Sequence, residues 1–188
     1  ANIIGQKICF KAVDDQLPSL GMSNVQHLIL NQAEGSIDTG KMMRSFLKKA
    51  QDLGILILNN AEVKTIEESD HTVRLSLQND WQIRARQIVI ATNGFSRQLL
   101  PQQAIQPARN LVLVTAPIPN LKIKGCFHYD RGYFYFRNVG DRLLLGGGRH
   151  LAKVAETSTE FQINPMIQTA LKELLENTIL PRQKVEIE

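Results

Sequence analysis

The segment Ala91–Gly94 has the residue types of a site that binds an anionic phosphate. It follows the apolar run Ile88–Ile90 and leads into Phe95–Leu100, which is predicted to be helical. A strand that ends in small residues beside a helix N-terminus presents backbone amides to a phosphate, and Gly94 allows a close backbone approach. The same four residues can also form an ordinary turn between a strand and a helix, and taken alone they favour that interpretation.

A second candidate for phosphate binding is the segment Gly35–Met42, which nearly matches the nucleotide-binding loop GxxxxGK[ST]. The last hydroxyl of that loop is a magnesium ligand, but here the position holds Met42, and a thioether binds so hard a cation poorly. No apolar strand ending in Asp follows to supply a second ligand. A turn and a capped helix start are therefore favoured over a nucleoside triphosphatase.

Arginine and tyrosine side chains in the second half could bind a carboxylate. Arginine does so through two parallel hydrogen bonds, and the candidates are Arg109, Arg137 and Arg149. Tyr133 and Tyr135 are two residues apart in a predicted strand, so we expect them to face the same side. A phenol is a neutral donor on an apolar ring and suits a dry pocket. The alternative is that both rings only pack against neighbouring strands.

The histidines and cysteines do not form a metal-binding pattern, and no metal site is predicted. Cys9 and Cys126 are far apart and outside any CxxC motif, which argues against a disulfide framework and favours a reducing compartment, the cytoplasm. No GxSxG motif of a serine hydrolase occurs. The histidines are dispersed, without an HxxxH or HxE spacing: His27, His71, His128 and His150.

Length, composition and charge are those of an ordinary globular protein. Of the 188 residues, 43% are hydrophobic and 21% are charged, which is enough to bury a core. The net charge of +4 is spread along the chain and forms no basic stripe of the kind that follows a nucleic-acid backbone. No apolar run approaches the roughly 20 residues that span a bilayer. Neither a nucleic-acid partner nor a membrane-spanning segment is predicted.

The elements that must position these residues begin with a loop at Leu17–Gly21 and a short strand at Val25–Leu30. Asp38 or Thr39 can cap a helix, in which apolar residues recur at helical spacing until Gly54 ends it. This helix is amphipathic and is expected to pack on one face. Strands are then predicted at Ile55–Leu58, Glu62–Ile66, Thr72–Leu77 and Ile88–Ala91, the last of them buried on both faces of a parallel sheet.

The second half is predicted to form a larger sheet and a helix. Pro165–Leu175 has the pattern of a helix with proline near its start, and the three glycines Gly146–Gly148 suit a bulge or the close approach of another backbone. The chain stops at Val185–Glu188, in what looks like a strand, and both ends look cut. The predicted strands of the larger sheet are Leu111–Thr115, Cys126–Asp130, Tyr133–Arg137 and Leu143–Gly147.

Six short segments, in this order and spacing, resemble the D-amino-acid oxidase-type FAD-dependent oxidoreductases. That family includes glycine and sarcosine oxidases and bacterial D-amino-acid dehydrogenases. The similarity covers about residues 25–150 and depends on the combination, because no single motif is specific. The segments are Glu34–Asp38 with the helix after it, Gly54-Ile55, Ala61–Val63, Ile88–Gly94, Ile105–Arg109 and Leu143–Gly147.

The resemblance implies an α+β fold derived from an α/β one: a partial FAD-binding domain and a mostly antiparallel substrate-binding sheet with flanking helices. The FAD-binding part is expected at residues 25–100 and the substrate-binding part at residues 101–180, with residues 1–24 packing against the latter. On the cofactor side, the resemblance implies that FAD contacts Val63 and the turn formed by Ala91, Thr92, Asn93 and Gly94.

On the substrate side, the resemblance implies that the strands between Leu111 and His150 cover the flavin ring. Tyr133 then has about the position from which related enzymes present a tyrosine to the substrate carboxylate, with Tyr135 beside it. Arg149 is a further candidate, although in several relatives the arginine lies further along the chain. Arg109 matches a common family position and is expected to be structural.

The sequence departs from the family in lacking GxGxxG, the turn that binds the FAD pyrophosphate. It also stops before the segment that approaches the flavin ring. We therefore expect an internal fragment that by itself holds little or no FAD and can self-associate through uncovered strand edges.

The implied parent enzyme oxidises the C–N bond of an amino acid or a secondary amine by hydride transfer to flavin N5. The cofactor carries the redox step, so no catalytic side chain is identified. The alternatives are a non-catalytic module that binds a small molecule, or a P-loop-like nucleotide-binding protein.

Overall fold

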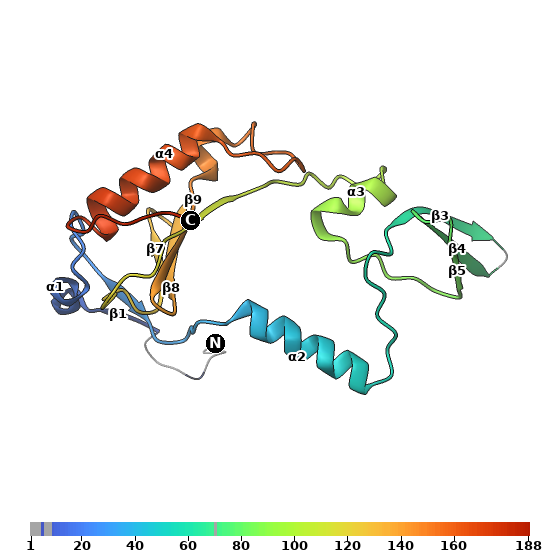
Figure 1. Ribbon diagram of the computed structural model, residues 1–188, viewed down its shortest axis with the longest axis horizontal. Coiled ribbons are helices and arrows are strands. Elements are labelled where there is room, and N and C mark those ends of the chain that lie inside the picture. The colour runs from blue at the N-terminus through green and yellow to red at the C-terminus, as the bar shows by residue number, and fades with distance from the viewer. Residues whose placement is uncertain (1–4, 6–8, 70) are drawn as a thin grey trace. The chain divides into compact units, whose positions relative to one another are not determined.

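The computed structural model describes Gly5, residues 9–69 and residues 71–188. The fold is α+β, as predicted, and the chain forms two compact units (Figure 1). One unit combines the described residues up to Ser36 with Arg109–Glu188, and the other is Ile37–Ala108. No helix in the described part of the chain has both the length and the apolar character needed to cross a bilayer.

The first unit is built on a four-stranded antiparallel sheet in the order β6-β9-β8-β7, which confirms the predicted larger sheet. Pairing is continuous: Tyr135 lies opposite Gly146, and Gly146 lies opposite Val112. The predicted strand positions agree with the structure to within two or three residues. The strands are β6 (Leu111–Val114), β7 (Cys126–Tyr129), β8 (Phe134–Val139) and β9 (Arg142–Gly147).

One face of this sheet is covered by α4 (Pro165–Leu174), which continues as a π-helical turn, Leu175–Ile179 (Figure 1). The helix begins as predicted, with Pro165 in its first turn and the Asn164 side chain accepting a hydrogen bond from the Met166 amide. Each fully buried aliphatic side chain contributes about 1.5–3 kcal/mol. The buried core side chains from the helix and the sheet are Ile167, Leu171, Leu175, Ile179, Leu113, Phe136, Leu143 and Leu145.

The N-terminal part of this unit pairs β1 (Phe10–Ala12) with β2 (Ile29–Asn31) in an antiparallel ribbon. The loop predicted at Leu17–Gly21 is wrong, because Leu17–Leu20 forms the short helix α1 after a 3₁₀ turn. Pro18 lies in the first turn of the helix, where its missing N–H costs nothing, and Gly21 ends it in the left-handed conformation. The strand predicted at Val25–Leu30 occurs later, at Ile29–Asn31.

The C-terminal residues run along β6 but form one bridge rather than the predicted strand. Ile187 is bridged to Thr115. The Glu186 carbonyl accepts from the Ala116 amide at 2.9 Å, and the Glu188 amide donates to the Val114 carbonyl at 3.0 Å.

The second unit begins with α2 (Thr39–Asp52), which confirms the predicted helix. The Asp38 side chain accepts from the Lys41 amide at 2.9 Å, and Gly54 follows in the left-handed conformation. The expected packing of this helix is wrong for the described residues, because none of its side chains is buried and Phe46 is 61% exposed.

The rest of the second unit is a three-stranded antiparallel sheet of β3 (Val63–Ser69), β4 (Thr72–Leu77) and β5 (Gln82–Ala85). The segments Ile55–Leu58 and Ile88–Ala91, predicted as strands, are not strands in the structure. A strand needs a ladder partner, and neither segment pairs with a described strand; Val89 is 92% exposed. A 3₁₀ turn (Asn93–Phe95) and α3 (Ser96–Leu99) follow.

Candidate functional site

The candidate substrate side chains lie at the start of β8. Phe134 and Phe136 point into the core, and Tyr135 between them is half-buried on the opposite face of the sheet. Tyr133 precedes the strand in a turn, where its amide donates to the Asp130 carbonyl at 2.9 Å. Alternation along the strand therefore separates the core phenylalanines from Tyr135.

Tyr133 stacks on His150. Their ring centroids are 4.0 Å apart with an interplanar angle of 27°, and Phe134 meets the same imidazole edge-on at 5.5 Å. Tyr133 is 47% exposed. The sequence gives His150 only as one of four dispersed histidines, because no local pattern links it to a tyrosine seventeen positions earlier. The stack fixes the Tyr133 ring and leaves half of its surface open.

Gly147 at the end of β9 and Gly148 after it permit this arrangement, which fits the predicted close approach of another backbone. The Gly148 amide donates to the Tyr133 carbonyl at 2.9 Å. A Cβ added to Gly147, whose φ is +119°, would lie 2.2 Å from that same carbonyl oxygen. No side chain larger than hydrogen fits at this crossing.

The three candidate arginines have different environments. Arg149 is exposed at the start of a 3₁₀ helix, Arg149–Ala152, and forms no ion pair within the described residues. Arg137 is half-buried, and its Nε donates to the Asn138 carbonyl at 3.3 Å. Among the three, Arg149 is the one whose guanidinium is most open to solvent.

Arg109 is held by Glu156. Its Nε and one terminal nitrogen donate to the two carboxylate oxygens at 3.0 and 3.2 Å, and Asn164 donates to the same carboxylate at 2.9 Å. The hydrogen bonds from Arg109, followed by that from Asn164, hold the pKa of Glu156 below its usual range against the opposing effect of burial. Arg109 therefore joins the start of β6 to the segment after β9, in agreement with the expected structural role.

Val63 and Thr92, both expected to contact the cofactor, line one pocket in the second unit. Its volume is about 460 Å³. The neighbouring Ala91, Asn93 and Gly94 do not line it. Asn93 has a left-handed backbone, and a Cβ on Gly94 would lie 3.1 Å from the Pro107 Cβ. Most of the remaining lining residues are apolar: Ala61, Glu62, Ile66, Leu75, Ile88, Val89, Ile90, Phe95, Gln98 and Leu99.

The residues of this pocket fit part of a flavin dinucleotide. Aliphatic side chains beside Phe95 suit a flat ring system, and Thr92 and Gln98 can form hydrogen bonds with its edge. No lysine or arginine lines the pocket, and the sequence contains no GxGxxG turn, so these residues do not supply a pyrophosphate site. The lining therefore suits a flat ring better than a phosphate.

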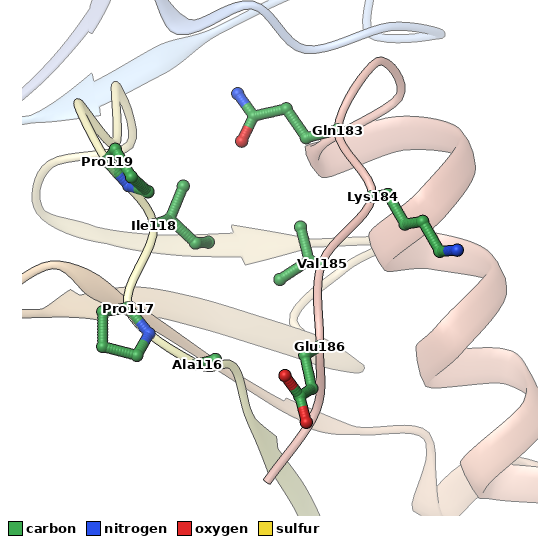
Figure 2. Close-up of a pocket in the computed structure, with 8 residues that line it drawn as sticks. All are labelled: Ala116, Pro117, Ile118, Pro119, Gln183, Lys184, Val185 and Glu186. Carbon is green, nitrogen blue, oxygen red and sulfur yellow. The ribbon is translucent and has the colours of Figure 1, made fainter.

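A second pocket, of about 470 Å³, lies in the first unit between residues 116–119 and the C-terminal segment 183–186 (Figure 2). Figure 2 shows Ile118 and Val185 pointing toward the space between the two segments, whereas Lys184 points away. Its lining consists mainly of prolines and aliphatic side chains, and with Lys184 pointing away Glu186 is left without a basic partner in the lining, so we assign it no chemistry.

The two remaining motif expectations concern phosphate loops and metals. In the segment Gly35–Met42, Asp38 caps α2 and the Lys41 ammonium lies 3.8 Å from its carboxylate, which is the capped helix start favoured from the sequence. Within the described residues, no group of three or more His, Cys, Asp or Glu side chains could hold a metal ion.

The model of the family FAD dependent oxidoreductase (DAO) matches residues 10–187. The chain belongs to this family, which confirms the resemblance found in the sequence. No curated protein matches the sequence.

Solved structures share the fold at low sequence identity. L-proline dehydrogenase from P. horikoshii has a TM-score of 0.73 and 16% identity, and covers 95% of this chain and 50% of its own. Glycine oxidase from Bacillus cereus ATCC 14579 has a TM-score of 0.75 and 15% identity, and the match covers 95% of this chain and 50% of the oxidase. Iminodiacetate oxidase (IdaA) from Chelativorans sp. BNC1 has a TM-score of 0.61 and 12% identity, and the match covers 98% of this chain and 51% of the oxidase. The chain thus spans about half the length of these proteins.

Proposed function

We propose that this chain is part of an enzyme that oxidises the C–N bond of an amino acid or a secondary amine, with hydride transfer to FAD. The observation that carries the proposal is the family match over residues 10–187 together with a tyrosine-bearing antiparallel sheet. L-Proline, glycine and iminodiacetate, named for the three similar structures, are all amines that carry a carboxylate. When bound, FAD would supply the hydride acceptor, which no side chain can provide.

In this proposal the residues of the chain bind and orient the substrate. The Tyr133 hydroxyl donates to the substrate carboxylate while His150 holds its ring, and Tyr135, two residues later in β8, offers a second donor. Arg149 adds a cation at the exposed end of the sheet. Holding the substrate carbon in a single orientation lowers the entropic part of the barrier.

The second unit contributes Val63, Thr92 and their neighbours to the cofactor site. Ala91, Asn93 and Gly94, which flank Thr92 in the chain but do not line the pocket, are proposed to lie against the cofactor as well. The pocket lining would offer the phosphates of FAD no cation, so we expect this chain alone to bind FAD weakly or not at all. Its two unpaired cysteines, Cys9 and Cys126, fit a reducing compartment, and we place the enzyme in the cytoplasm.

Two preparations test the function. The 188-residue chain is purified and its visible flavin absorbance is measured, and the same is done for a longer polypeptide that adds an upstream GxGxxG segment. We expect flavin only in the longer protein, and anaerobic bleaching of that flavin by L-proline, glycine or iminodiacetate. Near-stoichiometric flavin in the 188-residue chain contradicts the expectation that this chain alone binds FAD weakly or not at all. A flavin-loaded long protein that no amine reduces contradicts the proposed reaction.

A further inference from the structure

Tyr135 lies flat across the backbone of the neighbouring strand. It is directly opposite Gly146 in the β8–β9 pairing, and residues in such pairs share a face of the sheet. A Cβ built on Gly146 would lie 2.6 Å from the Tyr135 hydroxyl oxygen and 2.7 Å from its Cζ. The phenol end of the ring therefore occupies the space that any other residue at position 146 would fill.

The hydroxyl is held by Asn110, immediately before β6. The Asn110 Nδ2 donates to the Tyr135 oxygen at 3.1 Å. A phenol oxygen that accepts this hydrogen bond keeps its own hydrogen available for another acceptor. In the described part of the chain, no acceptor for that hydrogen is found.

The surroundings favour a neutral donor. Tyr135 is half-buried, with the exposed His128 opposite it on β7 and with Gly146 and then Val112 on its other side in the same row. Burial raises the pKa of Tyr135, so the phenol keeps its hydrogen at neutral pH. A neutral hydroxyl on a partly apolar surface is suited to an anionic oxygen that must leave water to reach it.

We propose that Asn110 and Gly146 are positioning residues that hold the Tyr135 hydroxyl so that its hydrogen bonds a carboxylate oxygen of the substrate. The inference rests on the proposed function, because it assigns the bound anion to the substrate of that reaction. Gly146 leaves the space in which the ring lies. Asn110 donates to the hydroxyl oxygen, and the hydroxyl hydrogen is left to face the ligand.

The first test is the ionisation of Tyr135, followed by NMR in the full 188-residue chain labelled with ¹³C at the tyrosine ζ-carbons. The chain has three tyrosines, so Tyr135→Phe assigns the signal. The Asn110 donor stabilises the phenolate, and we expect Asn110→Ala to raise the ionisation midpoint of Tyr135 without moving those of Tyr129 and Tyr133. Gly146→Ala is expected to do the same, because the added methyl displaces the ring. Gly35→Ala is the matched control, with no atom within 4 Å of its added Cβ.

The second test uses acetate as the carboxylate probe, added at neutral pH and ionic strength held constant. Acetate is expected to shift the Tyr135 signal, and Asn110→Ala to weaken its binding about five-fold, the ratio given by one ordinary hydrogen bond. Asn110→Asp, a change at an exposed position, should abolish the response, because the carboxylate accepts the Tyr135 hydrogen and repels the anion.

The proposal is overturned if Asn110→Ala leaves the ionisation midpoint of Tyr135 unchanged. It is also overturned if acetate does not shift the Tyr135 signal, or if acetate binds the wild type and Asn110→Ala equally. These outcomes are separate from the flavin experiment. A chain that passes both NMR tests while the longer protein reduces no flavin contradicts the proposed reaction and leaves an anion site at Tyr135. A longer protein that oxidises amines while Tyr135 ignores acetate contradicts this inference alone.

Discussion

The Arg109 guanidinium and the Glu156 carboxylate form an ion pair inside the first unit, with the Arg109 Nε 3.0 Å from a Glu156 oxygen and the Glu156 side chain 2% exposed. The Arg109 amide also donates to the Glu156 carbonyl at 3.0 Å. Two residues 47 positions apart are therefore joined through side chain and backbone together. The segment that carries Arg149 and His150 is fixed between β9 and this pair.

Breaking this pair from one side should destabilise the first unit. Arg109→Met leaves a buried carboxylate without its cation, and we expect a loss of about 3 kcal/mol in the free energy of unfolding. Glu156→Gln keeps an amide oxygen for Arg109 and should cost less, about 1–2 kcal/mol. Urea unfolding measures both. The exposed pair Lys48–Asp52 is the control, and Asp52→Asn should change stability by under about 0.5 kcal/mol. Equal effects at the two pairs would contradict the structure.

The same carboxylate predicts a pH dependence. The pKa of Glu156 is lowered in the folded protein from its ordinary value of 4.5, so its contribution is present above about pH 4.5 and is lost as the pH falls through the folded pKa. The difference in melting temperature between wild type and Glu156→Gln should therefore narrow below about pH 4.5. Thermal unfolding at a series of pH values measures it. A difference that stays constant down to pH 3, or widens, contradicts the assignment.

The sequence predicts those elements that have a local signal. The α4 helix has its proline, its asparagine cap and its apolar period within ten residues, and the four strands of the larger sheet are separated by turn residues. Leu17–Gly21 contains a proline and a glycine, which are common in loops, but proline is also tolerated in the first turn of a helix.

What the sequence cannot give is the identity of a distant partner. The apolar run Ile88–Ala91 indicates a preference for burial but does not show which strand lies beside it, and in the structure no described strand does. The partners of Arg109 and Tyr133 in the structure, Glu156 and His150, lie far along the chain, and no spacing rule predicts them. The candidate tyrosines could be named from the sequence, but the groups that orient them could not.

The crossing of Gly147 and Tyr133 should be intolerant of any side chain. Gly147→Ala combines a positive φ with a Cβ placed 2.2 Å from a backbone oxygen, and we expect a loss of about 3 kcal/mol or more. Gly140→Ala separates the two causes, because Gly140 also has a positive φ, +63°, but no atom within 4 Å of its Cβ. That variant should lose only about 1–2 kcal/mol. Similar losses of stability in the two variants would show that the positive φ alone, and not the contact with the Tyr133 carbonyl, makes a side chain unfavourable at position 147.

The exposed apolar side of α2 should drive self-association more than it stabilises the fold. Met43, Phe46 and Leu47 are all exposed, as are Leu53 and Leu56 after them. Exposed apolar side chains at helical spacing are suited to contact with another protein surface. Phe46→Gln should lower the apparent mass in light scattering at high concentration and leave the urea midpoint within experimental error. Lys49→Gln, on the same helix, is the control. A marked loss of stability in Phe46→Gln would show that this face is buried against the protein.

The Tyr133 hydroxyl can be separated from its ring in the longer, flavin-loaded protein. Tyr133→Phe keeps the stack on His150 and removes only the donor, so the melting temperature should be unchanged. Losing a hydrogen bond to a charged group costs about 1.5–3 kcal/mol, which corresponds to a rise in KM of about ten-fold or more for a carboxylate-bearing amine. In the proposed function the carboxylate is bound equally in the ground and transition states, so kcat should change little. Tyr129→Phe, in a residue that packs against the core, is the control for loss of a hydroxyl elsewhere on the sheet. A fall in kcat with constant KM would place Tyr133 next to the reacting bond and not at the carboxylate.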